Sequence, residues 1–138
     1  MIWTSEQIGK ALSLTLTTND KFGQVQFNSK DIEKGDIFIA LKGGARDGHE
    51  FVLDAFAKGA ALAIVSEDIK NAPVNKIIKV EDTFEALESL AEYKRQNSTA
   101  HFIGVTGSVG KTSTKEIIGL ILGSFGKTFV SRGNFNNH

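Results

Sequence analysis

A glycine-rich segment followed by Lys and Thr has the clearest chemistry in this sequence. Residues 104–116 read GVTGSVGKTSTKE. Glycines let backbone N–H groups turn toward phosphate oxygens, and the first turn of a following helix adds N–H groups and a positive dipole end. A lysine there supplies charge for the β- and γ-phosphates, and a threonine hydroxyl is suited to ligate Mg²⁺. The segment therefore predicts a site for ATP and Mg²⁺, formed by Thr106, Gly107, Ser108, Val109, Gly110, Lys111, Thr112 and Ser113.

The segment departs from the strict phosphate-loop pattern, which has a glycine five residues before the second loop glycine. That position is Val105. The alternative interpretation is an ordinary glycine turn with an incidental Lys-Thr. The flanking residues favour the nucleotide site. The apolar run at 101–105 is typical of a strand before such a loop, and the apolar run at 117–122 is typical of a helix after it. With a further strand near 127–130, the segment predicts a strand–helix–strand unit.

A second glycine-rich loop, residues 42–49, reads KGGARDGH. It lies between an apolar strand predicted at 36–41 and a helix predicted at 49–58. The chemistry leaves two interpretations open: a connecting turn in which Asp47 caps the helix, or a binding loop. We do not expect a general acid–base role for His49.

Alternating strands and helices place the chain in the α/β class. Thr4 and Gln7 form the pattern of a capping box at the start of a first helix. Asp82 begins another, which should end near Asn97 and carry Phe84, Leu87, Leu90 and Ala91 at helical spacing. Further strands are predicted near 25–27, 61–65 and 76–80. The polar stretch at 95–99 is the predicted domain boundary, which separates residues 1–97 from residues 98–138.

The composition excludes several classes of function. The 138 residues have a formal net charge of +0, with 41% hydrophobic and 23% charged residues, so no electrostatic case exists for a nucleic-acid or membrane surface. The absence of cysteine excludes disulfides, thiolate metal sites and a cysteine nucleophile. The first ten residues contain no apolar core of signal-peptide length, and no stretch approaches a transmembrane span, so a cytoplasmic location is expected.

Three segments of the chain resemble the Mur ligase family, the ATP-dependent amide ligases that build the peptidoglycan stem peptide. Residues 35–65 contain Gly-Asp-x-Phe-x-Ala, then Asp-Gly-His-x-Phe, then Gly-Ala before a strand, as the amino-terminal domain of the family does. The loop at 106–112 has the family's shorter form, and residues 133–138 resemble its Asn-rich segment. Asp47-Gly48-His49 and the Ser108-Val109 pair are most similar to members that add D-alanyl-D-alanine, rather than diaminopimelate or lysine.

The resemblance implies a small α/β substrate domain at 1–97, which holds a UDP-sugar peptide, and the first βαβ portion of a P-loop ATP-binding domain at 98–138. It implies cytoplasmic ligation of D-alanyl-D-alanine to UDP-N-acetylmuramoyl tripeptide through an acyl phosphate, by a monomeric enzyme that uses ATP and Mg²⁺. Lys111 and Thr112 would be catalytic, with Thr112 at the metal and Asn134 and Asn137 near the nucleotide. Substrate contacts are expected from Ser29, Lys30, Lys42, Gly43, Arg46, Asp47, Gly48 and His49.

One departure bears on these contacts: Asn28-Ser29-Lys30 stands where the family often has Asp-Ser-Arg. The chain also lacks most of the central domain and the carboxy-terminal domain that the resemblance implies, so we expect it to be inactive by itself. Two alternatives remain open. One is a related ligase with another acceptor, either a Mur ligase that adds diaminopimelate or lysine or an enzyme similar to folylpolyglutamate synthase. Enzymes of the latter kind generally lack a domain like residues 1–97. The other is a non-catalytic module that binds a UDP-sugar.

Overall fold

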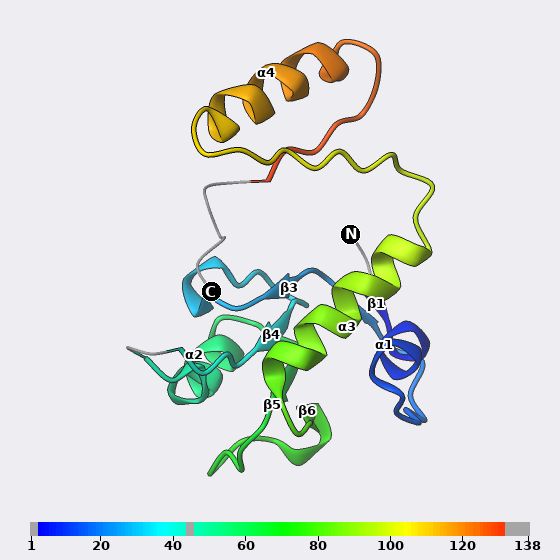
Figure 1. Ribbon diagram of the computed structural model, residues 1–138. Helices are drawn as coiled ribbons and strands as arrows, with labels where there is room; N and C mark the ends of the chain where they lie inside the picture. The colour runs from blue at the N-terminus through cyan, green and yellow to red at the C-terminus, as the bar shows by residue number, and fades with distance from the viewer. Residues whose placement is uncertain (1–2, 44–45, 132–138) are drawn as a thin grey trace. The chain divides into compact units, whose positions relative to one another are not determined.

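The computed structural model describes residues 3–43 and 46–131. The chain divides into two units, Met1–Ser98 and Thr99–His138 (Figure 1). This division lies one residue from the boundary predicted after Asn97.

A four-stranded parallel sheet forms the centre of the first unit, with the strand order β3-β4-β5-β6 (Figure 1). Its strands are β3 (Val25–Gln26), β4 (Ile37–Ile39), β5 (Leu62–Val65) and β6 (Ile77–Lys79). In the register, Val25 lies beside Ile37, Phe38 beside Ala63, and Ile64 beside Ile78. The order follows the sequence, so each strand is added beside the previous one and all carboxyl ends lie on one edge.

Short helices occupy the connections between these strands. The 3₁₀ helix η1 (Ser29–Asp31) lies between β3 and β4, and η3 (Val74–Lys76) precedes β6. Between β4 and β5 the structure has the 3₁₀ helix η2 (Gly48–Phe51) and then α2 (Val52–Ala57). The helix predicted at 49–58 is thus divided, because the Asp47 carboxylate accepts a hydrogen bond from the His49 N–H, two residues on, and the first turn is tight.

Alternate residues of the central strands enter two different cores, as the period of two in a strand requires. Ile37, Ile39, Leu62 and Ile64 face the helices α1 (Ser5–Leu12) and α3 (Thr83–Gln96). Phe38, Ala40, Ala63 and Val65 face α2, where they pack against Val52 and Ala55. The first unit is therefore a three-layer α/β/α arrangement, and its two central strands are buried on both faces. A separate antiparallel pair joins β1 (Trp3–Thr4) to β2 (Lys21–Phe22).

The helix caps predicted at Thr4 and Asp82 are confirmed. The Thr4 hydroxyl accepts from the Gln7 N–H at 3.2 Å, and the Thr4 N–H donates to Gln7 Oε1 at 3.2 Å, which completes the capping box. The Asp82 carboxylate accepts from the N–H groups of Phe84 and Glu85 at 2.6 and 3.1 Å.

The inward face predicted for α3 is partly wrong. Thr83, Ala86 and Leu90 are buried, whereas Phe84 is 47% exposed and Ala91 is also exposed. Successive helical residues are about 100° apart, so a face centred on Thr83 and Leu90 turns Phe84 and Ala91 to its side. Leu87 and Leu90 fit both the predicted and the observed orientation of α3, so the apolar spacing does not distinguish the two orientations.

In the second unit, the helix α4 (Lys111–Gly123) follows the glycine loop as predicted. The strands predicted at 101–105 and 127–130 are not found, so in the described part of this unit the strand–helix–strand prediction is wrong. A strand is defined by a ladder of hydrogen bonds to a neighbouring strand, and within residues 3–43 and 46–131 neither segment belongs to a sheet. Apolar side chains in both segments are accordingly exposed, with Phe102 at 58%, Ile103 at 57% and Phe129 at 87%.

None of the helices formed by residues 3–43 and 46–131 is long and apolar enough to cross a membrane.

Candidate functional site

The predicted substrate-binding residues lie where three neighbouring parallel strands end. Ser29 and Lys30 follow β3, residues 42–49 follow β4, and Ser66 and Glu67 follow β5. In open α/β sheets, ligands bind outside the carboxyl ends of the strands. Ser66 and Glu67 were not predicted from the sequence, although their position directly after a buried strand is a signal that could have found them.

The described residues on the two sides of the loop after β4 are hydrogen-bonded to each other and to the strand. Lys42 and Asp47 form an isolated antiparallel bridge, and the Gly43 N–H donates to the Arg46 carbonyl at 3.0 Å. The Gly48 N–H donates to the Leu41 carbonyl at 2.8 Å. A Cβ at Gly48 would lie 2.6 Å from the Leu41 oxygen and 2.7 Å from its nitrogen, so only glycine allows this approach.

His49 is buried, with 8% of its surface exposed, and both of its ring nitrogens have partners. Nδ1 lies 2.5 Å from Asp47 Oδ1. On the other side, the Ser66 N–H donates to Nε2 at 2.9 Å, and Ser66 Oγ lies 3.2 Å from Nε2. A backbone amide can only donate, so Nε2 accepts and Nδ1 carries the proton. The direct ligand contact predicted for His49 is therefore not supported by its surroundings.

Two carboxylates surround the ammonium group of Lys42. Its Nζ is 2.8 Å from Glu67 Oε1 and 3.6 Å from Asp47 Oδ2. Glu67, followed by Asp47, raises the pKa of Lys42. The pKa of Asp47 is lowered, first by the hydrogen bond from the His49 N–H, then by the His49 side chain.

One atom each from Asp47, His49 and Glu67 lies within 4.8 Å of the other two, a set that could hold a metal ion. Two observations argue against this use. Both His49 nitrogens already have partners within the protein, and the Lys42 ammonium lies against both carboxylates. The geometry is that of an ion-pair cluster.

The remaining predicted substrate residues differ in accessibility. Lys30, Lys42, Gly43 and Arg46 are exposed and accessible to a ligand. Ser29 is only 7% exposed. The pKa of Asp54 in α2 is lowered mainly by its hydrogen bond with Lys58 and next by one with the Ser29 hydroxyl. The Ser29 side chain is therefore directed toward α2.

In the predicted ATP loop of the second unit, two glycines adopt backbone conformations with positive φ. Gly107 and Gly110 have φ values of 154° and 78°, in the region that favours glycine. Gly110 is the N-cap of α4 and provides no side-chain cap. Lys111 Nζ donates to the Gly107 carbonyl at 2.5 Å, so the lysine folds over the loop.

Thr112 and Ser113 lie exposed in the first turn of α4. Asn134 and Asn137, predicted near the nucleotide, lie outside the described residues.

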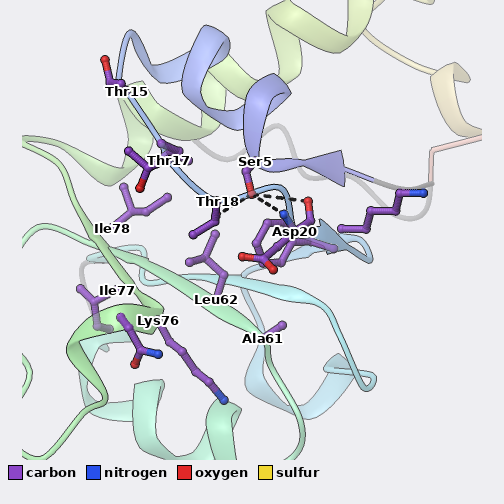
Figure 2. Close-up of a pocket in the computed structure, with 14 residues that line it drawn as sticks. Ser5, Thr15, Thr17, Thr18, Asp20, Ala61, Leu62, Lys76, Ile77 and Ile78 are labelled. Atoms are coloured by element: carbon purple, nitrogen blue, oxygen red, sulfur yellow. Dashed lines mark hydrogen bonds between the residues drawn. The ribbon is translucent and has the colours of Figure 1, made fainter.

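A separate hollow of about 480 Å³ lies at the opposite, amino-terminal edge of the sheet (Figure 2). The first residues of β5 and β6 line it, together with the segment at 15–22. Figure 2 shows the Ser5 hydroxyl bonded to Thr18 and to the backbone of Asp20. None of the predicted site residues that the structure describes lines this hollow.

The fold is that of an α/β protein whose predicted substrate loops lie at the carboxyl edge of a parallel sheet. A glycine loop and the helix α4 follow in the second unit. Residues 21–95 match the profile described as "Mur ligase family, catalytic domain". That match covers more than half of the chain and ends before the glycine loop. The chain therefore belongs to the Mur ligase family, and the α/β class is confirmed.

Similar proteins include both sequences and solved structures. The UDP-N-acetylmuramoyl-tripeptide–D-alanyl-D-alanine ligase of Rickettsia prowazekii is 51% identical over 138 residues, which are 100% of this chain and 30% of that protein. MurF from Acinetobacter baumannii superposes with a TM-score of 0.81 at 37% identity, over 97% of this chain and 30% of that one. MurF from Thermotoga maritima in complex with ADP has a TM-score of 0.61 at 39% identity, over 73% and 23%. The chain thus spans at most 30% of the length of these relatives.

Proposed function

We propose that the whole protein to which this chain corresponds is an ATP-dependent ligase that joins D-alanyl-D-alanine to UDP-N-acetylmuramoyl tripeptide in cytoplasmic peptidoglycan precursor synthesis. The observation that carries the proposal is the 51% identity with a ligase of that name, which extends over all 138 residues and includes both glycine loops. The D-alanyl-D-alanine acceptor is favoured over diaminopimelate or lysine by the Ser108-Val109 pair in the loop.

The first unit is the proposed site for the uridine nucleotide and sugar of the substrate. A diphosphate carries negative charge, and the exposed cations Lys30, Lys42 and Arg46 lie on loops at the carboxyl edge of the sheet. Gly43 allows the backbone to approach a ligand closely, whereas Gly48 allows the loop to pack against the main chain of Leu41. Asp47 and His49 would shape the loop after β4, and Ser29 would hold η1 against α2 through Asp54.

The second unit is the proposed start of the ATP site. The glycine conformations at 107 and 110 fit a loop that wraps a phosphate, and the hydroxyl of Thr112 has the oxygen chemistry that Mg²⁺ prefers. Residues 106–113 would hold the triphosphate, with Asn134 and Asn137 nearby. When bound, Mg²⁺ would neutralise phosphate charge. Lys111 would exchange the Gly107 carbonyl for phosphate oxygens, because an anion is a stronger partner for an ammonium group than a neutral carbonyl is.

The proposed reaction breaks one phosphate bond and forms one amide bond. The tripeptide carboxylate attacks the γ-phosphorus of ATP, which gives an acyl phosphate and ADP. The amine of D-alanyl-D-alanine then attacks the acyl carbon, and phosphate leaves with the bonding pair while the amine loses a proton. Such a reaction depends on positioning and charge neutralisation more than on a covalent side chain, and Lys111 is the group of this chain proposed to neutralise charge.

The test is an assay of the whole protein, and of this chain separately, for ADP release that requires both substrates. We expect the whole protein to turn over D-alanyl-D-alanine with UDP-N-acetylmuramoyl tripeptide. We expect no turnover of diaminopimelate or lysine with UDP-N-acetylmuramoyl-L-alanyl-D-glutamate, the substrate named for the diaminopimelate-adding relatives. Turnover with one of those amino acids instead would identify another Mur ligase. Binding of the UDP-sugar peptide without any turnover of the whole protein would identify a non-catalytic module.

A further inference from the structure

We propose that His49 is a positioning residue: in its neutral, Nδ1-protonated tautomer it fastens the loop after β4 to the end of β5 and so fixes the ammonium group of Lys42. His49 itself does not touch the ligand. The ligand class, a UDP-linked sugar, rests on the proposed function, whereas the fastening rests on the geometry of the first unit alone.

The first observation is that the imidazole joins two segments far apart in the sequence. Nδ1 lies 2.5 Å from Oδ1 of Asp47 within the loop, and Nε2 accepts from the Ser66 N–H at 2.9 Å across 17 residues of sequence. These partners lie on opposite sides of the ring. Among neutral polar side chains, only imidazole offers a donor and an acceptor on opposite sides of one rigid ring.

The second observation is that both partners of His49 lead to Lys42. Asp47 uses Oδ1 for His49, and its other oxygen, Oδ2, lies 3.6 Å from Lys42 Nζ. Ser66 is followed by Glu67, whose Oε1 lies 2.8 Å from the same Nζ. The contacts form a closed ring that runs from Lys42 through Asp47, His49 and Ser66–Glu67 back to Lys42. His49 is the buried member of this ring, with 8% of its surface exposed, whereas the side chain of Lys42 is 63% exposed.

The consequence is a division of roles within the loop. An exposed lysine by itself samples many rotamers, and ordering it for a ligand costs side-chain entropy. A ring anchored by a buried imidazole restricts those rotamers before the ligand arrives. Loss of His49 should therefore weaken ligand binding even in a chain that remains folded.

The experiment uses the 138-residue chain with His49→Phe, His49→Asn and His49→Gln. Phe keeps the ring volume without either nitrogen, Asn keeps a polar group near Nδ1, and Gln places an acceptor near Nε2. His101→Phe is the matched control, because His101 is exposed and lies in the other unit. Long-range ¹H–¹⁵N spectra report the tautomer, amide exchange reports the Ser66 N–H, and calorimetry with UDP-N-acetylmuramoyl tripeptide reports the Kd.

We expect Nδ1 to be protonated and Nε2 unprotonated in the wild type. In His49→Phe we expect faster exchange at Ser66 and a Kd raised about tenfold, on the order of one lost hydrogen bond. Gln should recover part of the affinity, and His101→Phe should leave it unchanged. If His49→Phe does not fold, His49→Asn decides the comparison.

Protonation at Nε2 in the wild type, or an unchanged Kd in a folded His49 variant, would overturn the proposal. If the wild type does not bind the UDP-sugar peptide, the proposed function fails instead. The His49 tautomer and the exchange rate of the Ser66 amide then test whether His49 joins the loop to β5. Protonation at Nδ1 in the wild type, together with faster Ser66 exchange in the variants, supports the proposal, and any other pattern rejects it.

Discussion

Gly48→Ala should destabilise the first unit because the added methyl group has no space. Its Cβ would lie 2.6 Å from the Leu41 oxygen, 2.7 Å from the Leu41 nitrogen and 2.9 Å from the Ala40 carbonyl carbon. All three are main-chain atoms at the end of a buried strand, so they cannot move aside as the end of a flexible side chain can. The loop itself must move, and the hydrogen bond from the Gly48 N–H to Leu41 is then weakened or lost.

The expected loss in the free energy of unfolding is about 1–3.5 kcal/mol, centred near 2 kcal/mol. Overpacking costs about 1–3 kcal/mol, and a lost hydrogen bond adds about 1 kcal/mol. Alanine also restricts the unfolded chain more than glycine does, which stabilises the folded state by about 0.4–1 kcal/mol and offsets part of this loss. Gly43→Ala is the matched control in the same loop, because the described atom nearest to its Cβ would be the Arg46 oxygen at 3.5 Å, an ordinary contact. Its effect should be within about 0.5 kcal/mol.

Urea denaturation followed by tryptophan fluorescence measures both variants. Trp3 is the single tryptophan of the chain and lies in the core of the first unit, with 4% of its surface exposed, so the signal reports that unit. With a slope of about 1–3 kcal/mol per molar, a loss of about 2 kcal/mol in Gly48→Ala should lower the midpoint by about 0.7–2 M. Equal midpoints for Gly48→Ala and Gly43→Ala would refute the steric argument.

Three further perturbations test the core, the ATP loop and the charge cluster. Leu90→Ala should cost about 2–5 kcal/mol because Leu90 is only 1% exposed, whereas Phe84→Ala should cost far less in the same urea assay; equal losses would contradict the face of α3 described above. Lys111→Ala should lower ATP-dependent turnover of the whole protein on the order of 10²–10³-fold without shifting its unfolding midpoint, and retained turnover would remove Lys111 from the mechanism. The pKa of Asp47 lies below its ordinary value of 3.8 in the folded chain, so its contribution to stability is present above that value and is lost as the pH falls toward the folded pKa. Asp47→Asn should therefore flatten the loss of stability as the pH falls below 3.8, and an unchanged acid profile would contradict this assignment.

Features set by neighbouring residues were predictable from the sequence. The capping box at Thr4 and the cap at Asp82 depend on side chains within three residues of the helix start. The two buried central strands were visible as short apolar runs. A glycine directly after a helix is a typical end signal, and Gly59, which follows the C-cap of α2, has a φ of 109°.

Features set by distant residues were not predictable in this way. The strand predicted at 101–105 has the right composition, but a strand also needs a neighbour, and apolar composition does not specify one. The contact between His49 and Ser66 spans 17 residues and depends on β4 and β5 lying side by side. The same sequence features that predict a ligand-binding histidine are equally typical of a buried one, and the hydrogen bonds distinguish them.

The most direct test of the account is calorimetric titration of this chain with UDP-N-acetylmuramoyl tripeptide, with its folding verified by circular dichroism and by the fluorescence of buried Trp3. The account predicts saturable binding at one site per chain, with affinity reduced in Lys42→Ala and unchanged in His101→Phe. A folded chain that shows no binding would contradict the assignment of the carboxyl edge of the first unit as a UDP-sugar site.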